Sequence, residues 1–109
     1  MSMKMYTAYS DSHKGMFEQF FLPTVPKEFD LKIEVFPQEC PSGTFYEKGW
    51  GTTCRRKIDL FVRACEENMG THFVFADADI QFFGECKDVL LEELGETDFA
   101  CQKDVSCAY

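Results

Sequence analysis

Two aspartates, Asp77 and Asp79, follow an unbroken apolar run at 73–76 and are separated only by Ala78. A continuous apolar run is typical of a strand covered on both faces, as in the parallel sheets of α/β proteins. Ligands of such sheets bind beyond the carboxyl ends of the strands. Two neighbouring carboxylates repel each other unless a cation lies between them, which favours a hard divalent ion with oxygen ligands. The simpler alternative is a turn in which Asp77 caps a backbone amide and Asp79 is solvated.

A second candidate group is the basic cluster Arg55, Arg56 and Lys57. It lies in the first turn of a helix that we expect to begin at Thr53, where the positive end of the helix dipole favours an anionic phosphate. The alternative is a set of surface ion pairs with acids such as Asp59. The cluster is therefore a candidate phosphate contact, and Lys57 borders the apolar stripe of the helix.

The elements expected in the first half of the chain are strand, helix and strand. Residues 4–8 form the first strand, and Asp11 and Ser12 in the polar turn after it are good helix N-caps. The helix that follows ends at Pro23. Residues 31–36 alternate as a second strand that Pro37 closes, and 38–52 read as a structured loop. The buried face of the first helix is expected to consist of Met16, Phe17, Phe20 and Phe21.

The second half continues the alternation. We expect a helix from Thr53 to Gly70, a strand at 71–76, a short extended segment at 80–83, a helix at 89–94 ended by Gly95, and a strand at 97–101. This order predicts an α/β fold with a Rossmann-like, mostly parallel sheet and helices on both faces. The apolar face of the longer helix is expected to consist of Ile58, Phe61, Val62, Cys65 and Met69.

Composition narrows the classes of function. The chain has 109 residues and a formal net charge of −8, which disfavours nucleic acid and anionic lipid as main partners. We find no signal-peptide core and no apolar run of membrane-spanning length, so membrane insertion is not expected. The six cysteines show no C-x-x-C pair and no zinc-ligand spacing, which favours reduced thiols in a cytoplasmic protein.

Three segments together resemble the nucleotide-diphospho-sugar transferases, glycosyltransferases of the GT-A fold. They are Glu-Lys-Gly-Trp-Gly at 47–51, Arg-Lys-Ile at 56–58, and the stretch from Gly70 to Gly84 that contains the Asp-x-Asp motif. The resemblance implies that residues 1–109 form the nucleotide-sugar-binding half of a GT-A-like domain. The acceptor site and any catalytic base would then lie beyond residue 109, as in an apparently truncated chain.

The resemblance also implies roles for particular residues. Asp77 and Asp79 would bind Mn²⁺ or Mg²⁺, which bridges the phosphates of a nucleoside-diphosphate sugar, with Asp79 as the direct ligand and Asp77 reaching the ribose or a metal-bound water. Tyr9, Ser10 and Asp11 would hold the base and the ribose, although Tyr9 can equally be a core residue. Lys57 would contact the donor. The sugar would pass to an unknown acceptor.

Two other classes of function stay open. In a haloacid-dehalogenase-type phosphatase, Asp77 would be the nucleophile and Asp79 the general acid. That family usually carries the motif on its first strand, whereas two β-α units precede it here, and Gln81 stands where Thr or Val is usual. A non-catalytic nucleotide- or partner-binding module is the third possibility, because one fold serves many functions.

Overall fold

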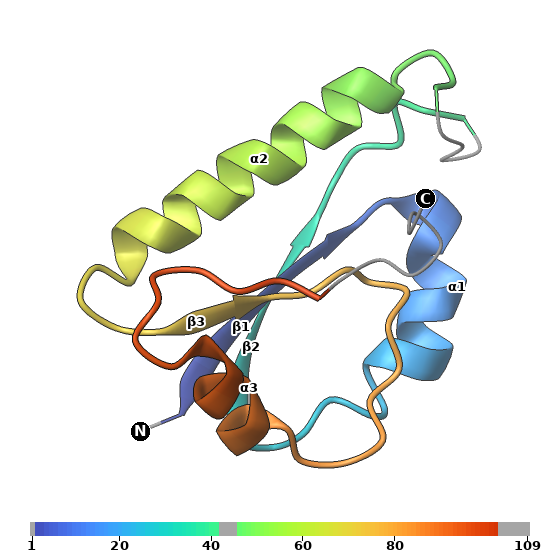
Figure 1. Ribbon diagram of the computed structural model, residues 1–109. Coiled ribbons are helices and arrows are strands. Elements are labelled where there is room, and N and C mark those ends of the chain that lie inside the picture. Colours follow the sequence, from blue (N-terminus) through green and yellow to red (C-terminus); the bar gives the residue numbers. More distant parts are fainter. Residues whose placement is uncertain (1, 42–45, 103–109) are drawn as a thin grey trace, which may run out of the picture.

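The structure, a computed structural model, describes residues 2–41 and 46–102 and contains a small parallel sheet with helices (Figure 1). Strand β1 lies in the middle of the order β2-β1-β3. It pairs with β2 from Met3↔Phe29 to Tyr9↔Val35 and with β3 from Lys4↔Phe73 to Tyr6↔Phe75. The elements in chain order are β1 (Met3–Tyr9), η1 (Asp11–His13), α1 (Lys14–Met16), η2 (Phe17–Phe21), β2 (Phe29–Val35), α2 (Trp50–Glu67), β3 (Phe73–Phe75) and α3 (Lys87–Leu94).

Helices cover both faces of the sheet, as the element order predicted. Met5 packs with Phe17 and Phe21 on the face covered by α1 and η2. Its neighbour Tyr6 packs with Leu60 and Ala64 on the face covered by α2. Successive side chains of a strand point to opposite faces, so a central strand between two helical layers needs apolar residues at consecutive positions. Figure 1 shows α2 along one side of the sheet and α1 on the other.

The first helical segment differs from the regular amphipathic helix that we expected. It ends in a π-helical turn, η2, in which the N–H of Leu22 donates to the carbonyl of Phe17 at 2.9 Å. This wider turn places Phe17 and Phe21 on one side, with ring centroids 5.3 Å apart. Met16 and Phe20 are 41% and 45% exposed, so their predicted burial is wrong.

The prediction of the buried face of α2 is also wrong for all of its residues except Phe61. Leu60 and Ala64 are buried and Phe61 is half-buried, whereas Ile58 is 62% and Met69 82% exposed. Compared with the prediction, the helix is rotated about its axis. Lys57 and Asn68 lie on its inward side because they find polar partners there, in Asp77 and Tyr6. Val62 and Cys65 lie on the exposed side as well. The helix begins at Trp50, three residues before the expected start.

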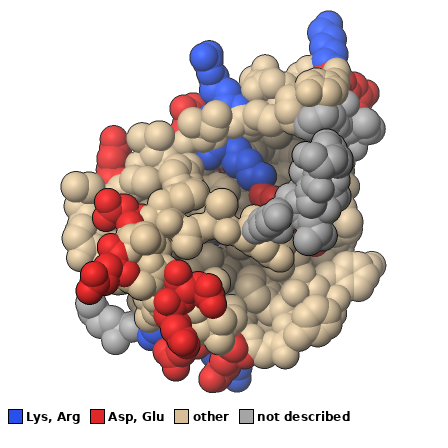
Figure 2. Space-filling view, in the orientation of Figure 1, with Lys and Arg blue, Asp and Glu red and all other residues tan. Residues whose placement is uncertain are grey.

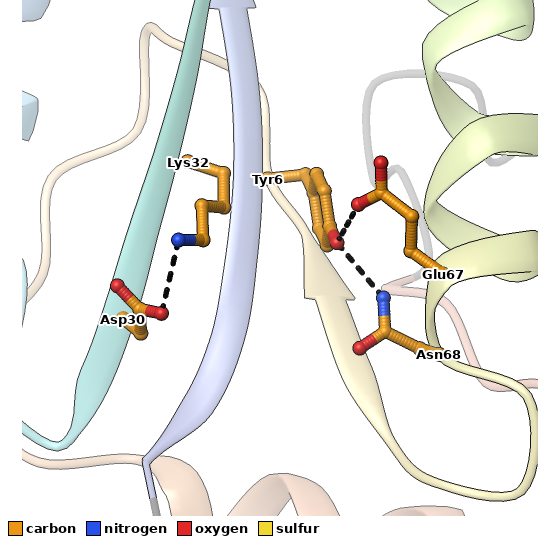
Figure 3. A network of polar contacts seen from close by, with 5 residues as sticks. All are labelled: Tyr6, Asp30, Lys32, Glu67 and Asn68. Atoms are coloured by element: carbon orange, nitrogen blue, oxygen red, sulfur yellow. Dashed lines mark hydrogen bonds and ion pairs between the residues drawn. The ribbon is translucent and has the colours of Figure 1, made fainter.

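One polar network, in which Tyr6 and Asn68 are buried, fixes the carboxyl end of α2 against the sheet (Figure 3). The hydroxyl of Tyr6 donates to Glu67 Oε2 at 2.7 Å and accepts a hydrogen bond from Asn68 Nδ2 at 2.9 Å. Asn68 Nδ2 also donates to the carbonyl of Ala64 at 2.7 Å. Burial, together with the Glu67 hydrogen bond, raises the pKa of Tyr6. The network ties the carboxyl end of α2 to Tyr6 in the middle of β1.

Two predicted extended segments are not strands. Residues 80–83 are irregular: Ile80 and Phe82 pack on the core beside η2, and the N–H of Phe82 donates to Thr24 Oγ1 at 3.0 Å. Their apolar character reflects this packing and not sheet pairing. Residues 97–101 are irregular and exposed, so the predicted strand at 97–101 is wrong. Helix α3 forms and ends at Gly95, whose φ is 56°, as expected.

No disulfide joins the five cysteines that the structure describes, and Cys107 lies outside the described residues. Among the described helices, none is long and apolar enough to cross a membrane.

Candidate functional site

An open pocket of about 200 Å³ lies at the carboxyl ends of the three strands. The segment after each strand contributes to it, as does the first half of α2 (Figure 1). Parallel strands deliver their carboxyl ends to one edge, so residues distant in sequence meet there. Figure 2 shows a basic and an acidic side chain meeting in a hollow beside α2. The lining residues are Ala8, Tyr9, Ser10, His13, Phe36, Cys40, Trp50, Thr53, Cys54, Lys57, Asp77, Ala78 and Asp79.

Asp77 and Asp79 reach the pocket from the turn that follows β3. Ala76 and Ala78 are 6% and 7% exposed and belong to the core, whereas the two aspartates that alternate with them are exposed. The alanines thus anchor the turn, and both carboxylates remain accessible from the pocket. Within residues 2–41 and 46–102, no hydrogen bond or ion pair engages Asp79.

Lys57 comes from α2 and forms an ion pair with Asp77 Oδ1. The two side chains are 44% and 56% exposed, so water screens this pair. Arg56 points elsewhere and pairs with Glu39 at 2.5 Å, and Arg55 does not line the pocket. Of the basic cluster, only Lys57 therefore enters the pocket. The charges of Lys57, Asp77 and Asp79 sum to one net negative charge in the pocket.

The turn after β1 brings some of its predicted site residues to the pocket. Tyr9 lines it and also stacks on Phe17, with ring centroids 4.5 Å apart, so it serves the core and the pocket wall together. Ser10 lines the pocket and is 8% exposed. Asp11 is exposed and is not a lining residue. The expected side-chain N-cap of this helical segment is not formed, and the N–H of Ser12 instead donates to Gln38 Oε1 at 2.8 Å.

Several lining residues were not singled out from the sequence. Thr53 and Cys54 precede Lys57 by four and three residues on α2, so helical spacing counted back from Lys57 would have found them. The loop before α2 supplies Cys40. This loop lies close to the start of α2: a Cβ on Gly49, the residue before the helix, would lie 2.1 Å from the carbonyl oxygen of Glu39. Phe36 and Cys40 carry no sequence signal for this position.

The donor set of the pocket fits a divalent cation that shares its coordination shell with a ligand. Asp77 and Asp79 supply carboxylate oxygens, which Mg²⁺ and Mn²⁺ prefer. The described part of the chain holds no group of three or more His, Cys, Asp or Glu side chains placed to bind a metal ion. Two carboxylates would leave most positions of a six-coordinate ion for phosphate oxygens and water.

Comparisons of the chain with protein-family models, with curated proteins and with solved structures find no match.

Proposed function

We propose that this chain is the donor-binding part of a GT-A-type glycosyltransferase, which binds a nucleoside-diphosphate sugar with Mn²⁺ or Mg²⁺ and transfers the sugar to an acceptor. One observation supports the proposal above all. Asp77 and Asp79 lie in one pocket with Lys57, at the carboxyl edge of a parallel sheet. That arrangement suits a metal-bound diphosphate, because it combines oxygen ligands for a cation with a cation for the phosphates.

Each residue then has a defined task. Asp79 and Asp77 would hold the metal ion, which supplies positive charge to the diphosphate leaving group. Lys57 would release Asp77 and donate to a phosphate oxygen. Tyr9 and Ser10 would contact the base and ribose from the turn after β1. Asp11, which the resemblance also implied, is not part of this proposal because it lies outside the pocket.

Thermal unfolding with UDP, GDP or CDP, each with and without Mn²⁺, tests the proposal. A ligand present at about ten times its Kd stabilises the native state by about 1.4 kcal/mol. For a domain of this size that raises Tm by about 5–10 °C. We expect a shift that needs both a nucleotide and the metal. The Asp79→Asn variant should lose it, and Asp98→Asn, an exposed aspartate outside the pocket, should keep it.

The same experiment, together with a phosphatase assay, separates the other two functions. Absence of a shift in every combination would contradict the proposal and favour a module that binds something else. A shift without metal would favour a non-catalytic nucleotide-binding module. Hydrolysis of a generic phosphoester that is lost in Asp77→Asn would favour the phosphatase.

A further inference from the structure

The outer edge of β2 has backbone groups without a strand partner. In the described part of the chain, β2 pairs only with β1 and no strand lies on its other side. The N–H of Phe36 donates to the carbonyl of Tyr9 at 2.7 Å, in the register that pairs Tyr9 with Val35. Backbone groups alternate sides along a strand. The even-numbered residues of β2 therefore bond to β1, and Leu31, Ile33 and Val35 point their N–H and C=O groups outward.

This edge lacks the usual protection against pairing. Strand β2 has seven residues, as many as the central strand, and contains neither a proline nor a bulge. A charged side chain commonly blunts such an edge. Here Lys32 is neutralised by Asp30, at 3.2 Å. The residues whose backbone groups point outward also have exposed apolar side chains, since Ile33 is 45% and Val35 61% exposed.

The pattern of β2 is complementary to itself in one antiparallel register. When the strand is centred on Ile33, that residue lies opposite Ile33 of the second copy, and Leu31 lies opposite Val35 of the second copy. All these residues have outward backbone groups, so they can form a hydrogen-bonded ladder. On the other face, Lys32 lies opposite Glu34 of the second copy, twice by symmetry, which forms two attractive pairs.

Other registers fit less well. Centring on Lys32 would place Lys32 opposite itself and Asp30 opposite Glu34 of the second copy, and these like-charged pairs repel each other. Centring on Leu31 would use Phe29, which is only 7% exposed, and would leave Val35 uncovered.

We propose that the outer edge of β2 is a self-association surface, on which β2 of a second copy of this chain pairs antiparallel with its centre at Ile33. The result is a two-fold symmetric dimer with one continuous sheet. The net charge of −8 on each copy opposes association, so the contact is expected to be weak. The proposal is independent of the pocket and its ligand.

Sedimentation velocity at protein concentrations from about 10 µM to about 1 mM tests it, because this range covers weak contacts. We expect a concentration-dependent dimer. Ile33→Lys should remain monomeric, because it places two like charges opposite each other. The matched control is Ile58→Lys, which changes an exposed isoleucine of α2 by the same charge and should still dimerise. A monomer at every concentration, or equal loss of the dimer in both variants, would overturn the proposal.

Charge reversal tests the register. Lys32→Glu should weaken the dimer at least several-fold, since Glu would then lie opposite Glu34 of the second copy. The double variant Lys32→Glu with Glu34→Lys should restore it in the register centred on Ile33. The register centred on Leu31 predicts no restoration, because Glu at position 32 would lie opposite Asp30. Since Glu34 also pairs with Arg63 at 2.7 Å, circular dichroism must first show that the double variant is folded.

Discussion

Lys57→Met should change two affinities in opposite directions. In the structure, the ammonium group of Lys57 pairs with the carboxylate of Asp77, which the proposal assigns to the metal. A cation that binds there must therefore displace Lys57 and then lie beside it. Once a nucleoside diphosphate is bound, however, Lys57 gains a phosphate partner. Lys57 thus opposes the metal alone and supports the metal together with the nucleotide.

The size of each effect follows from exposure. The side chains of Lys57 and Asp77 are 44% and 56% exposed, and such surface ion pairs are worth about 0.2–1 kcal/mol. Removing Lys57 should therefore tighten the binding of Mn²⁺ alone by up to about fivefold. A hydrogen bond from an ammonium group to phosphate is worth about 1.5–3 kcal/mol, and water screening favours the lower value. Binding of the nucleotide with Mn²⁺ should then weaken by about tenfold.

Isothermal titration calorimetry measures both affinities. The first titration uses Mn²⁺ alone, and the second uses UDP, GDP or CDP with Mn²⁺ in excess. The matched control is Lys27→Met, which removes the same charge just before β2, at the edge of the sheet opposite the pocket. The reasoning is refuted if Lys57→Met weakens both titrations, leaves both unchanged, or cannot be distinguished from Lys27→Met.

Three further predictions concern stability and reactivity. Gly49→Ala should destabilise the fold by at least about 2 kcal/mol in urea unfolding, because φ is +88° and the new Cβ meets a backbone oxygen. The control Gly51→Ala, whose new Cβ meets open space, should be neutral or stabilising. Equal effects of the two substitutions would contradict the close approach of Glu39 to Gly49. Tyr6→Phe should cost about 1–2 kcal/mol. Because the folded-state pKa of Tyr6 is raised, the unfolded chain releases this proton first, so the stability of the wild type should fall as pH rises above about 10. If the free energy of unfolding of Tyr6→Phe had the same pH dependence as that of the wild type, the network around Tyr6 would be contradicted. Burial, with a nearby carboxylate, raises the pKa of Cys86, so iodoacetamide followed by peptide mass spectrometry should modify it more slowly than the exposed Cys65; the reverse order would contradict its placement.

The alternation of elements and the position of the acidic motif could be predicted from the sequence because both depend on local patterns. The apolar run before Asp77 stands out by composition alone, so it predicted a buried strand without any information about the neighbouring strands. The core residues that close it, Ala76 and Ala78, alternate with the aspartates, which is why both carboxylates reach the same pocket.

The orientation of α2 could not be predicted because it depends on partners far away in the chain. Lys57 and Asn68 lie on the inward side, where Asp77 and Tyr6 engage them across 20 and 62 residues. Hydrophobic periodicity assigns such polar residues to the exposed face. For this reason it turned Ile58 and Met69 inward, although the structure exposes both.

The prediction of an extended segment after Asp79 was wrong for a related reason. Apolar residues at 80–83 have the composition of a strand, yet β3 ends at Phe75 and the chain leaves the sheet. Phe82 packs against Phe21, with centroids 5.4 Å apart, and its N–H is bonded to Thr24. Composition indicates burial there, but only the position of η2 decides what the segment packs against.

An anomalous difference map from crystals soaked with Mn²⁺ and a nucleoside diphosphate tests the central claim most directly. We predict one manganese peak within coordination distance of a carboxylate oxygen of Asp79, with the diphosphate on the same ion and Lys57 turned toward its phosphates. A pocket without manganese, or a nucleotide bound away from these aspartates, would contradict the account.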